Sequence, residues 1–381
     1  MWEISLNRRV IFGKDKILVC PTILKDFNVK KVFILTYDLK AQGLLALTQK
    51  LQSENIGYIL CDSVKAEPDL HVIDDAAELL KSEGCEGVIA IGGGSVMDAG
   101  KAIAMLAGNG GKIEEYQMQG KAITKPCLPL IVIPTTSGTG SEATKVSVIY
   151  NNNNGLKKSV YSPYMIADVV IFDPELTVKL PKKLTAATGM DALSHAIEAY
   201  VSLDATDVTE MYSLKALELI NRSFINATNN GDNVTARGDM MLASYLAGCA
   251  ITAGIGVAHI IAQPLGGLFK IPHGDACSIF LPISMETNLD YSLKKYRKIA
   301  EVLGVVNSDM DDRSAALAGI ERVKEIRSLT NAPDTLRGFI DRNNFDMEET
   351  WKKIFAATGH IKCNPRPISK ELICDIIEKS F

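Results

Sequence analysis

Residues 188–200, TGMDALSHAIEAY, place an aspartate and a histidine four positions apart in a stretch with the pattern of a helix. Four positions is just over one helical turn, so Asp191 and His195 would leave the same helix face and could converge on one point. A carboxylate and an imidazole at such a point could share a metal ion. A solvated Asp–His pair on a helix surface has the same spacing, so the rest of the chain must decide between the two interpretations.

Histidine is scarce in this chain, with five in total, and two of them lie 14 residues apart in GVAHIIAQPLGGLFKIPHGDA. Together with Asp191 and His195, His259 and His273 would supply one carboxylate and three imidazoles. That donor set suits Fe²⁺ or Zn²⁺ and differs from the all-oxygen sites of Ca²⁺. The spacing alone leaves open whether each histidine is a metal ligand or a satisfied core residue.

His259 falls inside residues 240–269, which contain no Lys, Arg, Asp or Glu. An uncharged run of this length can indicate a membrane-spanning helix. Here glycines and a proline interrupt the run, no basic flank orients it, and His259 and Gln263 would be unsatisfied in lipid. We therefore interpret it as a buried helix in the core of a domain and expect no membrane association.

A second kind of chemistry is indicated by GGGS at residues 92–95, which joins the apolar run GVIAI to a helical segment. Glycines let the backbone approach a ligand closely, and free amides at a helix N-terminus attract an anion, although any tight turn also favours glycine. The turn lacks the G-x-G-x-x-G dinucleotide fingerprint. A polar loop, PTTSGTGSE at residues 134–142, follows another apolar run. Two such loops at the carboxyl ends of parallel strands suggest one nucleotide site.

The elements that must hold these motifs change character near residue 180. Before it, short β-rich runs alternate with helical segments, which predicts a parallel sheet with crossover helices. The predicted strands lie in residues 31–36, 56–62, 87–95, 128–136 and 167–172. NNNNG at residues 151–155 is interpreted as the tip of a hairpin, and beyond residue 181 the pattern is helical. We predict a Rossmann-like α/β dinucleotide-binding domain over residues 1–181 and an all-helical metal-binding, catalytic domain over residues 182–381.

Composition limits the class of partner. The 381 residues are 47% hydrophobic and 23% charged, with a net charge of −4 and no dense basic run, which argues against nucleic-acid binding. The eight cysteines form no C-x-x-C pair, and the N-terminus lacks the apolar core of a signal peptide. We expect a cytoplasmic protein with free thiols that acts on small molecules.

These motifs together resemble the iron-containing (group III) alcohol dehydrogenases. The similarity covers nearly the whole chain, through GGGSVMDAGKAIA, PTTSGTGSEAT, DPELT, LTAATGMDALSHAIEAY, GVAH…PHG and NPRPIS. The resemblance implies that Asp191, His195, His259 and His273 bind one divalent metal ion, iron or alternatively zinc. It also implies hydride transfer between a nicotinamide and a small primary alcohol or aldehyde, and a homo-oligomer, expected to be a dimer.

The resemblance further implies NAD(H) or NADP(H) as cofactor. The residues it assigns to that cofactor are Asp38, Gly93, Gly94, Ser95, Asp98, Thr135, Thr136, Thr139, Ser141 and Lys157. Asp38 follows Thr36 and Tyr37, one residue later than the usual T-D of the family, whose aspartate binds the adenosine ribose, so the sequence favours NAD. Gln263 stands near the metal where many relatives have a histidine. It cannot titrate, so no proton-relay residue is assigned.

Two alternatives to this function remain. One is another activity of the same superfamily, either glycerol-dehydrogenase-like polyol oxidation or a dehydroquinate-synthase-like reaction. Enzymes with either activity tend to use three metal ligands, so the four candidate ligands in this chain count against both activities. The other alternative is a catalytically silent NAD-binding protein, which only Gln263 favours.

Overall fold

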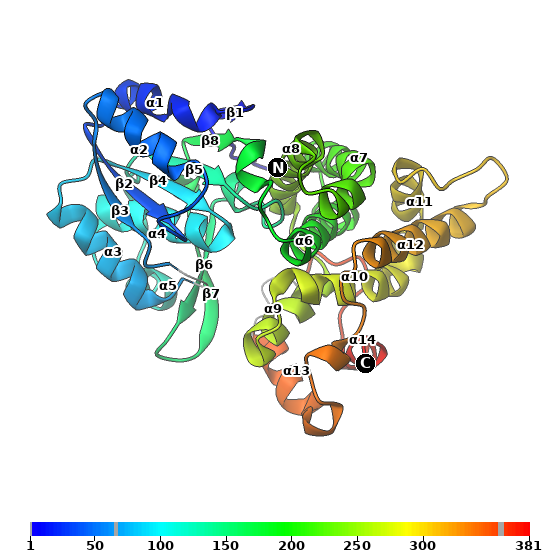
Figure 1. The fold of residues 1–381 in the computed structure, drawn as a ribbon. Helices are drawn as coiled ribbons and strands as arrows, with labels where there is room; N and C mark the ends of the chain where they lie inside the picture. Colours follow the sequence, from blue (N-terminus) through cyan, green and yellow to red (C-terminus); the bar gives the residue numbers. More distant parts are fainter. Residues whose placement is uncertain (1, 65–67, 357–361) are drawn as a thin grey trace. The chain divides into compact units, whose positions relative to one another are not determined.

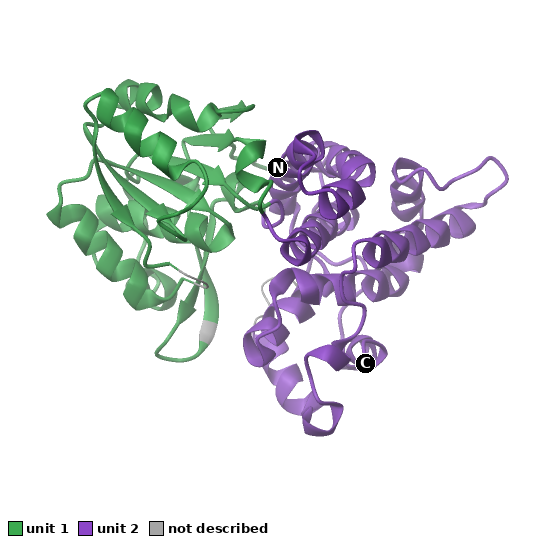
Figure 2. Ribbon diagram, viewed as in Figure 1, with its two compact units in different colours: residues 1–136, 140–179 green, residues 137–139, 180–381 purple. Residues whose placement is uncertain are grey.

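The structure is a computed structural model that describes residues 2–64, 68–356 and 362–381. The chain divides into two compact units, one of residues 1–136 and 140–179 and the other of residues 137–139 and 180–381 (Figure 2). Each unit has a hydrophobic core of its own.

The first unit is built on a six-stranded sheet in which every neighbouring pair is parallel, in the order β1-β8-β5-β4-β2-β3. The strands are β1 Arg9–Phe12, β2 Lys31–Thr36, β3 Gly57–Cys61, β4 Gly87–Gly92, β5 Leu130–Pro134 and β8 Val169–Phe172. The central strands β4, β5 and β8 are buried along their whole length, which explains their uninterrupted apolar runs. All five predicted strands are confirmed. The edge strand β1 was missed because it is short and largely exposed.

Helices cover both faces of this sheet (Figure 1). They are α1 Cys20–Asp26, α2 Leu44–Ser53, α3 Leu70–Ser82, α4 Gly94–Asn109 and α5 Ile113–Met118. Leu24 of α1 and Leu47 of α2 share one core with Ile34 and Ile89 of the sheet. On the other face α4 lies so close to β4 that a Cβ added to Gly100 would be 2.7 Å from the Cβ of Ala90.

The predicted hairpin tip is also confirmed. Strands β6 Val146–Asn151 and β7 Leu156–Tyr161 pair antiparallel on either side of it. The side chain of Gln117 in α5 donates to the carbonyls of Ile149 and Lys158, at 2.9 and 3.1 Å, and so ties one strand to the other.

Every regular element described from residue 182 onward is helical, as predicted. The helices are α6 Lys182–Val201, α7 Asp207–Asn229, α8 Val234–Ala250, α9 Val257–Phe269, α10 His273–Asn288, α11 Leu293–Val302, α12 Asp312–Leu329, α13 Met347–Ala356 and α14 Lys370–Lys379. One core joins α6, α7, α8, α11 and α12, and a second joins α9, α13 and α14, with α10 contributing to both.

The uncharged run at residues 240–269 is two helices, so the prediction of one continuous helix was wrong. Helix α8 ends at Ala250, and α9 begins at Val257 after a short 3₁₀ turn. Gly254 in the break has φ +86°, a left-handed conformation that favours glycine. No single described helix is long and apolar enough to cross a membrane. The segments Val234–Ala253 and Val257–Phe269 pass that test only as a pair bent by 105°.

Candidate metal centre and nucleotide edge

Asp191 and His195 lie on the buried face of α6. Their relative exposures are 2% and 6%, and His195 Nε2 lies 3.7 Å from Asp191 Oδ1. The alternative of a solvated pair on a helix surface is therefore wrong. Helix α6 is buried on almost every side, so a charged residue within it needs a partner or an ion.

The other two predicted ligands meet the same carboxylate oxygen. His259 in α9 and His273 at the start of α10 each place Nε2 3.4 Å from Asp191 Oδ1. The rings of His195 and His259 stack with centroids 4.5 Å apart. Oxygen and nitrogen donors about 2.0–2.2 Å from one tetrahedral ion would lie roughly 3.3–3.6 Å from each other. The donor set and its spacing thus fit one divalent transition-metal ion.

Sequence reasoning missed a fifth side chain in this cluster, the thiol of Cys277. Its Sγ lies 3.6 Å from Asp191 Oδ1, 3.6 Å from His259 Nε2 and 3.7 Å from His273 Nε2. Asp191, His259, His273 and Cys277 each offer a donor atom within 4.8 Å of all the others. Cys277 follows His273 by four residues in α10, the same spacing that revealed Asp191 and His195, so the sequence did contain a signal for it.

Two hydrogen bonds orient the imidazoles. Glu198, 4% exposed on α6, places Oε2 2.5 Å from Nδ1 of His259. His195 Nδ1 lies 3.3 Å from the carbonyl oxygen of Gly138. When Nδ1–H donates in each case, Nε2 is the atom of each ring that is left to bind a metal ion. Glu198 was also missed, although it lies three residues after His195 and so on the same side of α6.

The N-terminus of α9 is held by side chains from elsewhere in the second unit. Glu198 Oε1 accepts from the Ala258 amide at 2.8 Å, and Asn364 Oδ1 accepts from the Val257 amide at 3.2 Å. A Cβ on Gly256 would lie only 2.7 Å from Glu198 Oε1, so this approach requires glycine. Glu198 therefore fixes both the helix that carries His259 and the imidazole itself.

The electrostatics of the cluster favour a positive charge. Burial acts to raise the pKa of Asp191, but the surrounding imidazoles, His195 foremost, hold it below its ordinary value. Burial lowers the pKa of His195 to about 4, which keeps that ring neutral at physiological pH. Burial also acts to lower the pKa of His259, but the facing Cys277 and Glu198 outweigh it and raise that pKa well above its ordinary value. An anionic carboxylate and a neutral imidazole are the protonation states that a metal ion binds.

The four predicted ligands differ in exposure. The side chain of His273 is 40% exposed, whereas those of Asp191, His195 and His259 are 3%, 7% and 2% exposed. His273 is therefore the predicted ligand that reaches solvent. Gln263, predicted to lie near the metal, follows His259 by one turn of α9 and is partly buried.

In the first unit, the glycine-rich turn and the loop after β5 lie side by side. The amide of Thr135 donates to the carbonyl of Gly92 at 2.9 Å, and a Cβ on Gly93 would lie 3.2 Å from both Cγ2 and Oγ1 of Thr136. Gly93 is the N-cap of α4 and makes no side-chain cap bond, while Gly94 and Ser95 form the first turn of the helix. The carboxyl edge of the sheet thus presents backbone amides at a helix N-terminus next to threonine hydroxyls, an arrangement suited to a phosphate.

The remaining predicted cofactor residues have different surroundings. Asp98 is engaged on both oxygens, since Oδ1 accepts from Ser141 Oγ at 2.5 Å and pairs with Lys101 Nζ at 2.9 Å, and Oδ2 accepts from the Val148 amide at 2.9 Å. Asp98 and Ser141 therefore connect α4 to the hairpin and the preceding loop. Lys157 lies on β7 opposite Tyr150.

Asp38 and Thr139 complete the predicted set. Asp38 is exposed just beyond the carboxyl end of β2, and its Oδ1 accepts from the Lys40 amide at 2.9 Å. Because β2 neighbours β4, Asp38 lies at the same edge of the sheet as the glycine-rich turn. Thr139 belongs to the second unit.

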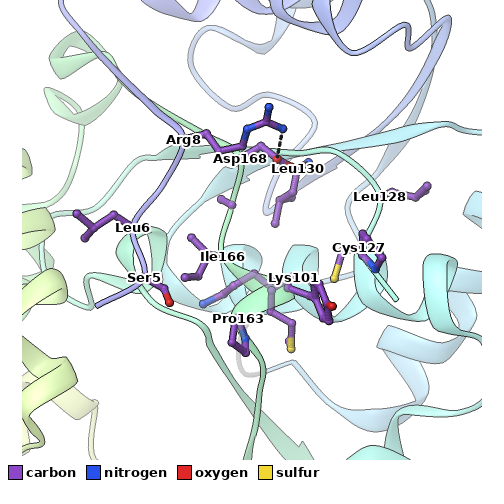
Figure 3. A pocket seen from close by; sticks show the side chains of 14 residues that line it. Ser5, Leu6, Arg8, Lys101, Cys127, Leu128, Leu130, Pro163, Ile166 and Asp168 are labelled. Atoms are coloured by element: carbon purple, nitrogen blue, oxygen red, sulfur yellow. Dashed lines mark hydrogen bonds and ion pairs between the residues drawn. The ribbon is translucent and has the colours of Figure 1, made fainter. Parts of the chain in front are cut away.

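A cavity of about 310 Å³ lies at the opposite edge of the same sheet (Figure 3). Leu128 precedes β5 and Asp168 precedes β8, so the cavity opens near the amino ends of these strands. The ion pair between Arg8 and Asp168 lies at its wall, with an N–O distance of 3.4 Å. Ligands of open parallel sheets bind at the carboxyl ends, so this cavity is distinct from the nucleotide edge.

Comparison with known proteins covers both units. A family model described as iron-containing alcohol dehydrogenase matches residues 7–174, and a model of the C-terminal region of the Fe-containing alcohol dehydrogenase family matches residues 185–381. The chain is 37% identical over 376 residues to the NAD-dependent methanol dehydrogenase of Bacillus methanolicus, and the match covers 97% of each chain.

Solved structures resemble the whole chain. A 1,3-propanediol oxidoreductase superposes with a TM-score of 0.96 at 31% identity, over 100% of both chains. A sulfoacetaldehyde reductase from Bifidobacterium kashiwanohense, solved in complex with NAD⁺, superposes with a TM-score of 0.90 at 26% identity, over 100% of this chain and 98% of the other.

Proposed function

Because this chain belongs to the iron-containing alcohol dehydrogenase family, we propose that Asp191, His195, His259 and His273 bind one divalent metal ion beside which a small primary alcohol or aldehyde reacts with NAD(H). The observation that carries the proposal is the convergence of three imidazole Nε2 atoms on Asp191 Oδ1, at 3.4–3.7 Å. When bound, the ion would polarise the oxygen of the alcohol or aldehyde, and the nicotinamide would exchange a hydride with its carbon. The protein is an enzyme, an alcohol dehydrogenase of the iron-containing type.

The side chains have separate tasks in this proposal. Asp191 supplies the negative charge, and Glu198 and the Gly138 carbonyl fix the imidazoles of His259 and His195 so that Nε2 is available. The exposed His273 borders the path by which substrate enters. Gln263 has no ionisable proton, so we assign the alcohol proton to solvent or to a hydroxyl of the bound cofactor.

The cofactor is proposed to bind at the carboxyl edge of the first unit. The amides of Gly93, Gly94 and Ser95 would bind the pyrophosphate, with Thr135 and Thr136 on the nicotinamide side. Thr139 and Lys157 remain proposed contacts of the cofactor. Asp98 and Ser141 are proposed to support the edge instead, through the hydrogen bond between their side chains. An exposed carboxylate at Asp38 would accept from a ribose hydroxyl and repel a 2′-phosphate, which favours NAD over NADP.

The substrate class rests on chemistry common to the relatives. The names of three similar proteins refer to methanol, 1,3-propanediol and sulfoacetaldehyde, whose reacting ends are primary alcohols or aldehydes. We propose the same class for this chain, and a homodimer of twice the 41.3 kDa chain mass, which light scattering on the purified protein would measure.

The deciding experiment is a metal-reconstitution assay. The protein is first treated with a chelator and then reloaded with Fe²⁺ under anaerobic conditions, or with Zn²⁺. Each preparation is assayed with NADH and a panel of short aldehydes, and with NAD⁺ and the matching alcohols. We expect turnover only in metal-loaded protein at about one ion per chain, and a lower KM for NADH than for NADPH. Equal turnover before and after metal removal, or none with any aldehyde at full loading, would contradict the proposal.

A further inference from the structure

The cluster around Asp191 contains more donor atoms than the four-ligand site uses. Cys277 is completely buried, and its Sγ faces one carboxylate oxygen and two imidazole nitrogens. Cys277 forms no disulfide, so its sulfur is available to a metal ion. Cys277 also belongs to the apolar core that α9, α10, α13 and α14 share, but its Sγ lies beside three metal-ligand candidates.

The distances around Cys277 match coordination geometry. A sulfur about 2.3 Å and a nitrogen or oxygen about 2.0–2.2 Å from one tetrahedral ion would lie roughly 3.5–3.7 Å apart. The observed separations from Sγ to Asp191 Oδ1, His259 Nε2 and His273 Nε2 are 3.6, 3.6 and 3.7 Å. A thiol hydrogen bond to a single acceptor would explain one such distance, but a shared ion explains three at once.

The backbone also positions this thiol. His273 and Cys277 lie four residues apart on α10, as Asp191 and His195 do on α6, so each helix directs two donors to one point. Helix α9 adds His259 alone. Asp191, His259 and His273 are common to two possible sets of four, one completed by His195 and the other by Cys277.

We propose that the metal ion of this site can also be held by the second set of four, in which Cys277 is a sulfur donor beside Asp191, His259 and His273. This inference rests on the proposed function, because it assigns a residue to the ion assumed there. The S–H proton passes to solvent as the sulfur–metal bond forms. A sulfur donor shifts the preference of the site toward Zn²⁺ and away from Mn²⁺, which favours oxygen ligands.

The first test needs no substitution. X-ray absorption at the zinc edge of the Zn²⁺-loaded wild-type protein is expected to show one sulfur neighbour at about 2.3 Å among nitrogen and oxygen neighbours at about 2.0–2.2 Å. A shell of nitrogen and oxygen alone at full loading would overturn the role of Cys277 and leave the proposed function intact. Failure to bind either Zn²⁺ or Fe²⁺ would overturn the proposed function itself.

The second test uses matched variants loaded with Co²⁺. The wild type is expected to show a near-ultraviolet thiolate-to-cobalt charge-transfer band that is lost in both Cys277→Ser and Cys277→Ala. Cys249→Ser changes another buried cysteine of the same unit and should keep the band. Chelator competition should show Zn²⁺ binding weakened roughly ten-fold or more in Cys277→Ser, with a smaller change for Mn²⁺. Equal weakening for the two ions, or a band that persists in both Cys277 variants, would overturn the inference.

Discussion

The metal cluster and the nucleotide edge are built in opposite ways. At the cluster, side chains from α6, α9 and α10 meet on one carboxylate oxygen, and the backbone only holds them in place. At the nucleotide edge, the groups proposed to bind the cofactor are backbone amides at the start of α4, where Gly93 and Gly94 have no side chain. Removing atoms should therefore disable the first region, and adding atoms should disable the second.

The largest effect is expected from deleting one imidazole. His259→Ala should lower the amount of bound metal and turnover by more than about a hundred-fold, because the change removes a buried donor that contacts both Asp191 and Cys277. NADH binding, measured by fluorescence titration, should stay within about two-fold of wild type because all the proposed cofactor contacts except Thr139 belong to the other unit. Parallel loss of metal and NADH binding would contradict this separation of tasks.

A positioning residue of the cluster should give the next largest effect. Glu198→Gln retains the side-chain shape but weakens the acceptor for His259 Nδ1, which lies 2.5 Å away, so metal affinity should fall about 10- to 100-fold. Chelator competition measures this change. Glu218→Gln, at an exposed position on α7, is the matched control and should have no effect. An unchanged affinity in Glu198→Gln would mean that packing alone orients His259.

A smaller effect is expected at the nucleotide edge, where an added side chain should weaken cofactor binding and leave metal binding unchanged. Gly93→Val adds a branched side chain whose Cβ lies 3.2 Å from Thr136, beside the amides at the start of α4, so the KM for NAD(H) should rise roughly ten-fold. Bound metal should stay at the wild-type level. Gly338→Val, where an added Cβ meets nothing within 4 Å, is the control. A wild-type KM for NAD(H) in Gly93→Val would mean that GGGS is only a tight turn and does not bind the cofactor.

The contrast between the regions also explains what the sequence could predict. The apolar runs of β4 and β5 and the spacing of Asp191 and His195 were sufficient to predict strands and a shared helix face, because both follow from local periodicity. Cys277 and Glu198 were missed although each follows a predicted ligand by three or four residues, because this spacing alone does not show which residues meet them in three dimensions. The break at Gly254–Gly256 was missed for the same reason. Gly256 is required there because Glu198, from a distant helix, occupies the space of its side chain.

The two regions also contain buried carboxyl groups with opposite properties. Imidazoles face Asp191 and hold its pKa below the ordinary value although burial acts against them. Glu142, in the 3₁₀ turn Ser141–Ala143 beside the nucleotide edge, is 2% exposed, and its Oε1 has no hydrogen-bond partner among the described residues. Burial raises the pKa of Glu142 to about 7, and the nearby Lys101 offsets this only in part. Glu142 therefore titrates near physiological pH.

The smallest predicted effect follows from this shift in Glu142. Its folded-state pKa of about 7 exceeds the ordinary value of 4.5, so the folded chain retains a proton that the unfolded chain releases. The resulting stability is complete below pH 4.5 and is lost as pH rises through 7. Glu142→Gln cannot ionise, so its free energy of unfolding should lie within about 1 kcal/mol of wild type at pH 5 and exceed that of wild type at pH 8 by up to about 3 kcal/mol. Denaturant unfolding at both pH values measures the difference. If the free energies of unfolding of Glu142→Gln and wild type differed by the same amount at pH 5 and pH 8, Glu142 would not titrate in this range. Its unpaired oxygen would then be accommodated without a proton.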